Sequence, residues 1–152
     1  PLPLRAVRVP HWSAMGGLPG TALELHIRTT QKPHKDYSMT VIIAGTLHFP
    51  DGTREQALAD TAALVLETRT QTGCLHYVWS ADPTSSTCVY VYEKWASVPD
   101  LAAHLAGPYY RGMLGKLGQL GVYDIDISKY RIDLEEPVYD PQGNPRADFF
   151  TA

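Results

Sequence analysis

The sequence predicts an α+β domain in which one antiparallel sheet carries helices on one of its faces. Alternating or apolar segments at 40–49, 74–82, 87–95 and 122–133 predict strands. Apolar residues at helical spacing follow the first strand, and capped segments that predict helices follow the third. The resulting order, β-α-β-β-α-(α)-β, is the split β-α-β or ferredoxin-like arrangement.

Composition sets broad limits on what the protein does. The 152 residues are 44% hydrophobic and 19% charged, which suits one domain with its own core. A net charge of −3 argues against a basic nucleic-acid-binding face. No apolar run approaches the roughly 20 residues of a membrane span. Cys74 and Cys88 lie too far apart to bond in the expected hairpin, so we expect free thiols and a cytoplasmic protein.

The chain divides into three parts of different character. Residues 1–38 form a basic extension rich in proline and glycine, with five Lys/Arg and two acids. Residues 39–133 hold the patterned domain, and residues 134–152 form an extended tail with several prolines. The extension is either an arm that docks on a partner subunit or a start placed too far upstream, and the sequence leaves both open.

The first helix is expected between Pro50-Asp51-Gly52, which closes the first strand, and Gly73, which ends the helix. Thr53 and Gln56 have the spacing of a capping box. An apolar stripe at helical spacing predicts the face that packs on the core. Its members are Leu58, Ala62, Val65 and Leu66.

The second and third strands, Cys74–Asp82 and Thr87–Trp95, form a hairpin around the turn at 83–86. If Asp82 lies opposite Thr87, one face of the hairpin carries a set of large aromatic residues. This set is Tyr77, Trp79, Tyr90 and Tyr92. Because both faces of these strands are apolar, we expect helices to cover one face and a second subunit the other. The sequence therefore predicts a homodimer.

Two further helices are predicted before the last strand. Ser97 caps the first of them, and Asp100 stands three residues later. The stripe that should face the core is Val98, Leu101, Ala102 and Leu105, with His104 at its edge. The second helix, Pro108 to Leu117, contains glycines that each weaken it by about 1 kcal/mol relative to alanine, so it is a candidate lid.

Six short motifs occur in order along residues 39–133. They are V-x-x-A-G from Val41, P-x-G-x-x-x-x-A from Pro50, T-R-x-x-x-G-C-L-x-Y from Thr68, D-P at Asp82, E-x-W-x-S from Glu93 and H-L-x-x-P-Y from His104. In this order and spacing they resemble the antibiotic biosynthesis monooxygenase (ABM) domain family. The resemblance implies a dimeric α/β barrel with an α+β subunit, and a monooxygenase as its activity.

Family members oxygenate phenolic or quinol-like substrates with O2, so the resemblance implies a small aromatic substrate and no cofactor. Such chemistry needs a base or an oxyanion partner inside a dry apolar box. His104 is the expected catalytic residue, since its pKa suits proton abstraction at neutral pH. The expected substrate-binding residues are Tyr77, Trp79, Trp95, Tyr109, Tyr110, Arg111 and Met113.

Glu93 lies on a strand that is expected to be central, where a carboxylate must be paired or protonated. We expect a supporting role in an ion pair, with Arg69, Arg111 or Lys129 as partner. No set of side chains has metal-ligand spacing, so no metal is expected. The residues that degrade haem in one branch of the superfamily have no match here, although haem binding through His104 stays open.

Three functions remain open at this point. The first is a cofactor-independent monooxygenase acting on a small aromatic, quinol or polyketide-like substrate. The second is a non-oxidative isomerase or lyase of a small carbonyl compound, with His104 as acid and base. The third is a non-catalytic dimer that binds a ligand or a partner. Oxygen uptake separates the first from the other two.

Overall fold

The computed structural model describes residues 39–151, and the predicted extension at 1–38 lies outside the described residues. The elements follow the predicted order, which confirms the ferredoxin-like α+β fold. They are β1 (Val41–His48), α1 (Arg54–Arg69), β2 (Cys74–Ala81), β3 (Cys88–Trp95), α2 (Val98–Leu105), α3 (Pro108–Gln119) and β4 (Tyr123–Arg131).

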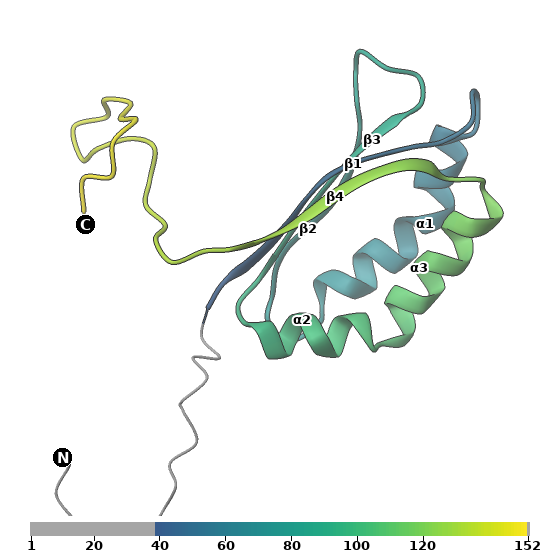
Figure 1. Cartoon of the computed structure of the whole chain (residues 1–152), viewed down its shortest axis with the longest axis horizontal. Coiled ribbons are helices and arrows are strands. Elements are labelled where there is room, and N and C mark those ends of the chain that lie inside the picture. The colour runs from purple at the N-terminus through teal and green to yellow at the C-terminus, as the bar shows by residue number, and fades with distance from the viewer. Residues whose placement is uncertain (1–38, 152) are drawn as a thin grey trace, which may run out of the picture. The chain divides into compact units, whose positions relative to one another are not determined.

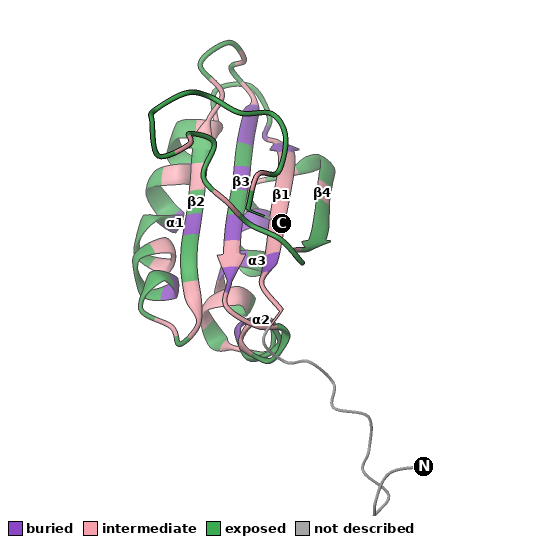
Figure 2. Ribbon diagram, turned by 90° about the vertical axis from the view of Figure 1, so that its left-hand side faces the viewer, coloured by how far each residue is buried: buried purple, intermediate pink, exposed green. Residues whose placement is uncertain are grey.

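The strands of residues 39–151 form one antiparallel sheet in the order β2-β3-β1-β4. The helices α1, α2 and α3 all lie on one face of this sheet (Figure 1). Buried residues concentrate on β3 and at the ends of β1, while β4 is mostly exposed (Figure 2). The core therefore lies between the two central strands and the helices. In residues 39–151, no helix combines the length and the apolar character that crossing a membrane requires.

The pairing of β2 with β3 begins as predicted and then shifts. Cys74 lies opposite Trp95, but the register changes between Cys74 and His76, so Tyr77 lies opposite Glu93. A β-bulge of this kind adds one residue to one strand and changes the pairing of all residues beyond it. Propensity and alternation do not mark such a bulge, which is why the sequence predicted the unshifted register.

The shift separates the aromatic residues that the sequence grouped together. Trp79 lies opposite Val91 and faces the helices, whereas Tyr90 and Tyr92 are 51% and 38% exposed on the open face. Because side chains alternate along a strand, a slip of one residue moves each of them to the other face. The predicted single face with Tyr77, Trp79, Tyr90 and Tyr92 is therefore wrong.

The helix α1 packs on the core with only part of the predicted stripe, since Leu58 and Val65 are partly buried against it while Ala62 and Leu66 are exposed. Its buried residues are Ala57, Thr61 and Thr68, while Leu66 is 61% exposed. The Thr61 hydroxyl donates to the Ala57 carbonyl oxygen at 2.7 Å, so its polar atom is satisfied inside the core. A rule that counts only apolar residues does not find a face built on two threonines.

The start of α1 differs from the prediction as well. The Thr53 hydroxyl donates to the Pro50 carbonyl oxygen at 2.7 Å and makes no capping hydrogen bond. The Gln56 amide donates to Asp60 at 2.6 Å. The expected capping box is therefore absent at this end of the helix.

The helix α2 keeps its predicted cap but presents another face to the core. The Asp100 N–H donates to the Ser97 hydroxyl at 3.2 Å, which confirms the cap. Leu101 and His104 are the buried residues of this helix. Leu101 of the predicted core stripe is buried as expected, whereas Val98 and Leu105 are exposed and His104 is buried instead.

Gly45 on β1 allows β4 to come unusually close. A Cβ atom at this position would lie 2.0 Å from the carbonyl oxygen of Asp126 and 2.6 Å from Cα of Ile127. Since both atoms belong to the backbone of β4, they cannot move aside as a side chain can. We expect Gly45→Ala to lower the free energy of unfolding by about 3 kcal/mol in urea titrations.

Gly115→Ala is the matched control for this substitution. Nothing lies within 4 Å of a Cβ built at Gly115 on α3, so this change should raise stability by about 0.5–1 kcal/mol. Equal effects of the two substitutions would contradict the close approach of β1 and β4.

Candidate functional site

His104 lies in a cage of aromatic rings, and its side chain is almost inaccessible at 1% exposure. Its ring stacks on Trp95 with centroids 4.6 Å apart and planes at 29°. Tyr77 and Tyr110 approach it edge-on at 5.6 Å and 5.4 Å. Residues from β2, β3, α2 and α3 thus meet at one point beneath the helices. We refer to Tyr77, Trp95 and Tyr110 around His104 as the aromatic cage.

Gln71, in the turn between α1 and β2, holds the imidazole from outside the cage. Its Oε1 lies 2.7 Å from Nδ1 of His104. An amide oxygen only accepts, so Nδ1 carries the proton and Nε2 keeps a free lone pair. Nε2 is buried and finds no hydrogen-bond partner among the described residues. Burial lowers the pKa of His104 below its ordinary value of 6.5, so the ring is neutral at pH 7.

Sequence reasoning missed Gln71. It occupies one of the variable positions of the T-R-x-x-x-G-C motif, and neither the motif nor any periodicity marks it. No feature of the sequence distinguishes Gln71 from its polar neighbours Thr70 and Thr72 in the same turn, which Gly73 ends with φ of 76°.

Glu93 is buried on β3 beside the cage, at 5% exposure. Its Oε2 accepts from Nε1 of Trp95 at 3.1 Å. No ion pair joins it to a cation of residues 39–151, and Arg69 donates instead to the Tyr77 carbonyl oxygen at 2.8 Å. Burial raises the pKa of Glu93 from 4.5 to about 7, an effect that the Trp95 bond only partly offsets.

Tyr77 adds a second protonated group next to Glu93. Burial is the main cause of the raised pKa of its phenol, and the negative charge of Glu93 adds to it. Tyr77 is therefore a neutral hydroxyl at physiological pH. The site thus combines a neutral imidazole acceptor with a hydroxyl and a carboxyl that is about half protonated at neutrality.

The other predicted site residues are scattered. Met113 is buried at 2% exposure in the main core. Tyr109 is half-buried, and its hydroxyl donates to Glu67 at 3.3 Å near the surface. Arg111 is exposed and donates to the carbonyl oxygen of Ala106. In the part of the chain that the structure describes, no group of three His, Cys, Asp or Glu side chains could hold a metal ion.

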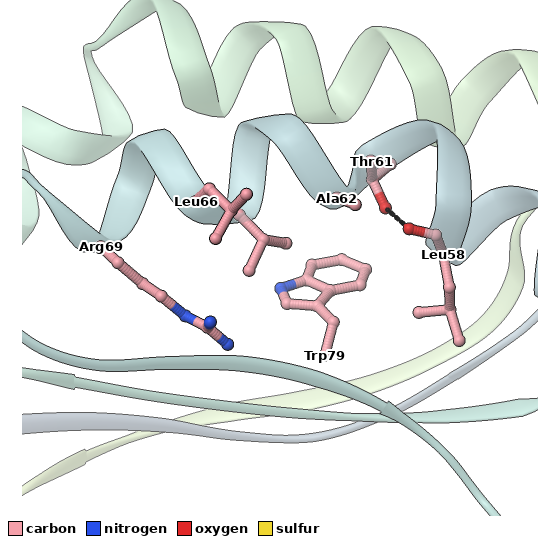
Figure 3. A pocket seen from close by; sticks show the side chains of 7 residues that line it. Leu58, Thr61, Ala62, Leu66, Arg69 and Trp79 are labelled. Atoms are coloured by element: carbon pink, nitrogen blue, oxygen red, sulfur yellow. Dashed lines mark hydrogen bonds between the residues drawn. The ribbon is translucent and has the colours of Figure 1, made fainter.

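Trp79 faces a different recess, between α1 and β2 (Figure 3). This recess has a volume of about 270 Å³. It is lined by Leu58, Thr61, Ala62, Val65, Leu66, Arg69 and Trp79. His104 does not line it, and the aromatic cage itself is closed over the imidazole. The structure therefore brings Tyr77, Trp95 and Tyr110 to His104 and leaves Trp79 outside that group.

Comparison with known structures finds the same fold in shorter proteins, which match about two thirds of this chain. A proposed antibiotic biosynthesis monooxygenase of Deinococcus radiodurans is 26% identical, with a TM-score of 0.57 over 66% of this chain and 99% of its own. A conserved protein of unknown function from Bacteroides thetaiotaomicron is 18% identical, with a TM-score of 0.57 over 62% of this chain and 99% of its own.

The sequence is also similar to an uncharacterized protein of Synechocystis. The two are 23% identical over 92 residues, which is 60% of this chain and 63% of that protein. Residues 40–115, half of the 152-residue chain, match the family described as Antibiotic biosynthesis monooxygenase. This match spans β1 through most of α3 and includes both His104 and Glu93. The chain therefore belongs to the antibiotic biosynthesis monooxygenase family.

Proposed function

We propose that this chain is a cofactor-independent monooxygenase that oxidises a small aromatic, quinol or polyketide-like substrate with O2 at the aromatic cage. The observation that carries the proposal is the buried, neutral imidazole of His104, whose Nε2 has no partner among the described residues. An unpaired buried acceptor destabilises a fold, so its presence calls for an explanation such as a catalytic role. Membership of the family supports this class of reaction.

The reaction begins with removal of a proton from the phenolic substrate. Nε2 of His104 takes this proton, and the resulting phenolate is electron-rich enough to pass an electron to O2. When a ring CH2 becomes C=O, one oxygen atom enters the substrate and the other leaves as water. The balance CH2 + O2 → C=O + H2O needs no external reductant, which is why the chemistry needs no redox cofactor.

Hydrogen-bond donors beside the base assist this step. The Tyr77 hydroxyl and the protonated form of Glu93 can stabilise the negative charge that develops on the substrate oxygen. Trp95 positions both His104 and Glu93, since its ring stacks on the first and its N–H donates to the second. A site without water strengthens each of these interactions.

Entry to the cage requires a movement, and α3 is the element suited to it. Tyr110 on α3 forms one wall of the cage. This helix contains Gly112, Gly115 and Gly118, each of which lowers helix stability. Opening of α3 would uncover His104 and bring the substrate past Tyr109 and Arg111. Under this proposal these two residues act at the entrance, and Met113 anchors α3 in the core.

The assembly that we propose is a homodimer formed through the open face of the sheet. This face carries several exposed aromatic and aliphatic side chains, which are Val78, Tyr90, Tyr92 and Tyr130. Large exposed aromatic and aliphatic side chains gathered on one face of a sheet are characteristic of an interface. Packing two copies sheet to sheet would bury it and leave the helix-covered side of each subunit for the substrate.

Oxygen consumption with a model hydroquinone or anthrone tests the reaction class. We expect uptake of O2 in step with product formation. Turnover of a small carbonyl compound without oxygen would favour the isomerase or lyase instead, since a buried base beside a protonated carboxyl also suits enolisation. Binding of aromatic compounds without any turnover would favour the non-catalytic dimer.

Replacing His104 with alanine should lower kcat/KM about 100-fold or more, because the reaction loses its base. In the wild-type protein, kcat/KM should fall on the acid side with a midpoint below 6.5, since burial lowers the pKa of His104. Gln71→Glu should move this midpoint to higher pH, because a carboxylate beside Nδ1 favours the charged ring. Gln119→Glu, at the end of α3, is the control and should leave the midpoint in place.

The pH dependence of stability tests the environment of Glu93. The folded state holds its proton up to about pH 7, whereas an ordinary carboxyl loses it near 4.5. The free energy of unfolding should therefore fall by about 3 kcal/mol as the pH rises through this range. Glu93→Gln cannot ionise, so it should match the wild type at pH 4 and exceed its stability at pH 8. Equal stability of the two proteins at pH 8 would contradict a buried Glu93 carboxyl with a raised pKa.

Light scattering in solution tests the assembly. Tyr92→Glu places a charge on the open face in both copies, so we expect a folded monomer in place of the dimer. Tyr139→Glu, in the exposed tail, is the control and should leave the mass unchanged. A Tyr92→Glu protein that stays dimeric would show that this face is not the interface.

A further inference from the structure

The stripe of apolar residues on α1 that the sequence marks as core-facing packs on the core only in part, through Leu58 and Val65. All four of its members line the recess between α1 and β2, together with Arg69 and Trp79 (Figure 3). Leu66 is 61% exposed, and Ala62 is exposed as well. The chain thus places an apolar stripe of helical spacing over a hollow that its own side chains leave unfilled.

Trp79 contributes an unpaired hydrogen-bond donor to this recess. Its Nε1 is buried and has no acceptor among the described residues. The Trp79 side chain acts to lower the pKa of Tyr77, although the two side chains form no hydrogen bond. A buried N–H without an acceptor is unfavourable, and an acceptor supplied by a ligand removes that cost.

Arg69 contributes the positive charge. Its Nε donates to the Tyr77 carbonyl oxygen at 2.8 Å, which fixes the guanidinium at the side of the recess. No carboxylate of residues 39–151 forms an ion pair with it. In Figure 3 the guanidinium extends toward the indole of Trp79 from the end of α1. The Arg69 and Trp79 donors therefore lie beside a mostly apolar hollow whose lining includes no carboxylate.

We propose that this recess binds a small, flat, apolar carboxylate, with its ring against Trp79 and the α1 stripe. Its carboxylate lies between the Arg69 guanidinium and Nε1–H of Trp79, where a planar fork matches the two oxygens. The recess has a volume of about 270 Å³. A cavity of about 150 Å³ accommodates benzene, so the recess has room for a ring with its carboxylate.

This binding site is separate from the oxygenation proposed at the aromatic cage. His104 is not among the residues that line the recess. The recess lies on the helix-covered side of the sheet, so dimerisation through the open face leaves it accessible. A carboxylate bound there is a second ligand of the protein and does not depend on the monooxygenase reaction.

Nuclear magnetic resonance of the full chain tests the proposal with benzoate as the probe. The chain has three tryptophans, and Trp79→Phe identifies the indole N–H signal of Trp79. Benzoate should move this signal downfield and saturate, because a new acceptor meets Nε1–H. Benzyl alcohol has the same ring without the charge, so its affinity should be at least about tenfold lower than that of benzoate.

Two variants complete the test. Arg69→Gln removes the charge and should weaken benzoate binding about tenfold, whereas Arg146→Gln in the tail should leave it unchanged. Ala62→Phe fills the hollow from an exposed position of α1, so it should abolish binding even if Arg69→Gln disturbs β2. Absence of a saturable Trp79 shift, equal binding of the two probes, or full binding to Ala62→Phe would overturn the proposal.

Discussion

The stacking of His104 on Trp95 determines how α2 lies on the sheet and which polar atoms the core must accommodate. The helix has only eight residues, so one strong contact decides which of its sides faces inward. Turning His104 inward leaves Val98 and Leu105 in solvent and brings the imidazole within reach of Gln71. The cage thus forms because the His104 ring packs on the Trp95 ring, while the aliphatic side chains of Val98 and Leu105 remain exposed.

A core of this kind contains more ionisable groups than stability alone would favour. Burial pushes the pKa of His104 down and the pKa of Glu93 up, so both groups tend toward their neutral forms. Pairs of titratable groups shifted by burial next to each other are more common at functional sites than in structural cores. The Trp95 indole serves both groups, since its face stacks on one and its N–H binds the other.

The sequence predicts the fold well because strands and helices follow from local alternation and spacing, as β1 and β3 do here. It predicts contacts less well where a single inserted residue or a satisfied polar group decides them. The bulge after Cys74 reversed the facing of Tyr90 and Tyr92 relative to Tyr77. Thr61 is buried because its hydroxyl bonds to the backbone of its own helix. The contact of Gln71 with His104 was not predicted because the two residues are 33 positions apart in the chain.

Two apolar surfaces are left once the core is complete, and their shapes suggest different occupants. The open face of the sheet is broad and carries Tyr92 and Tyr130 without a hollow, which suits a second flat surface of the same chain. The recess beneath α1 is small and concave, and it holds the unpaired donor of Trp79 beside the charge of Arg69. A carboxylate supplies an acceptor for this donor and a partner for the Arg69 charge together.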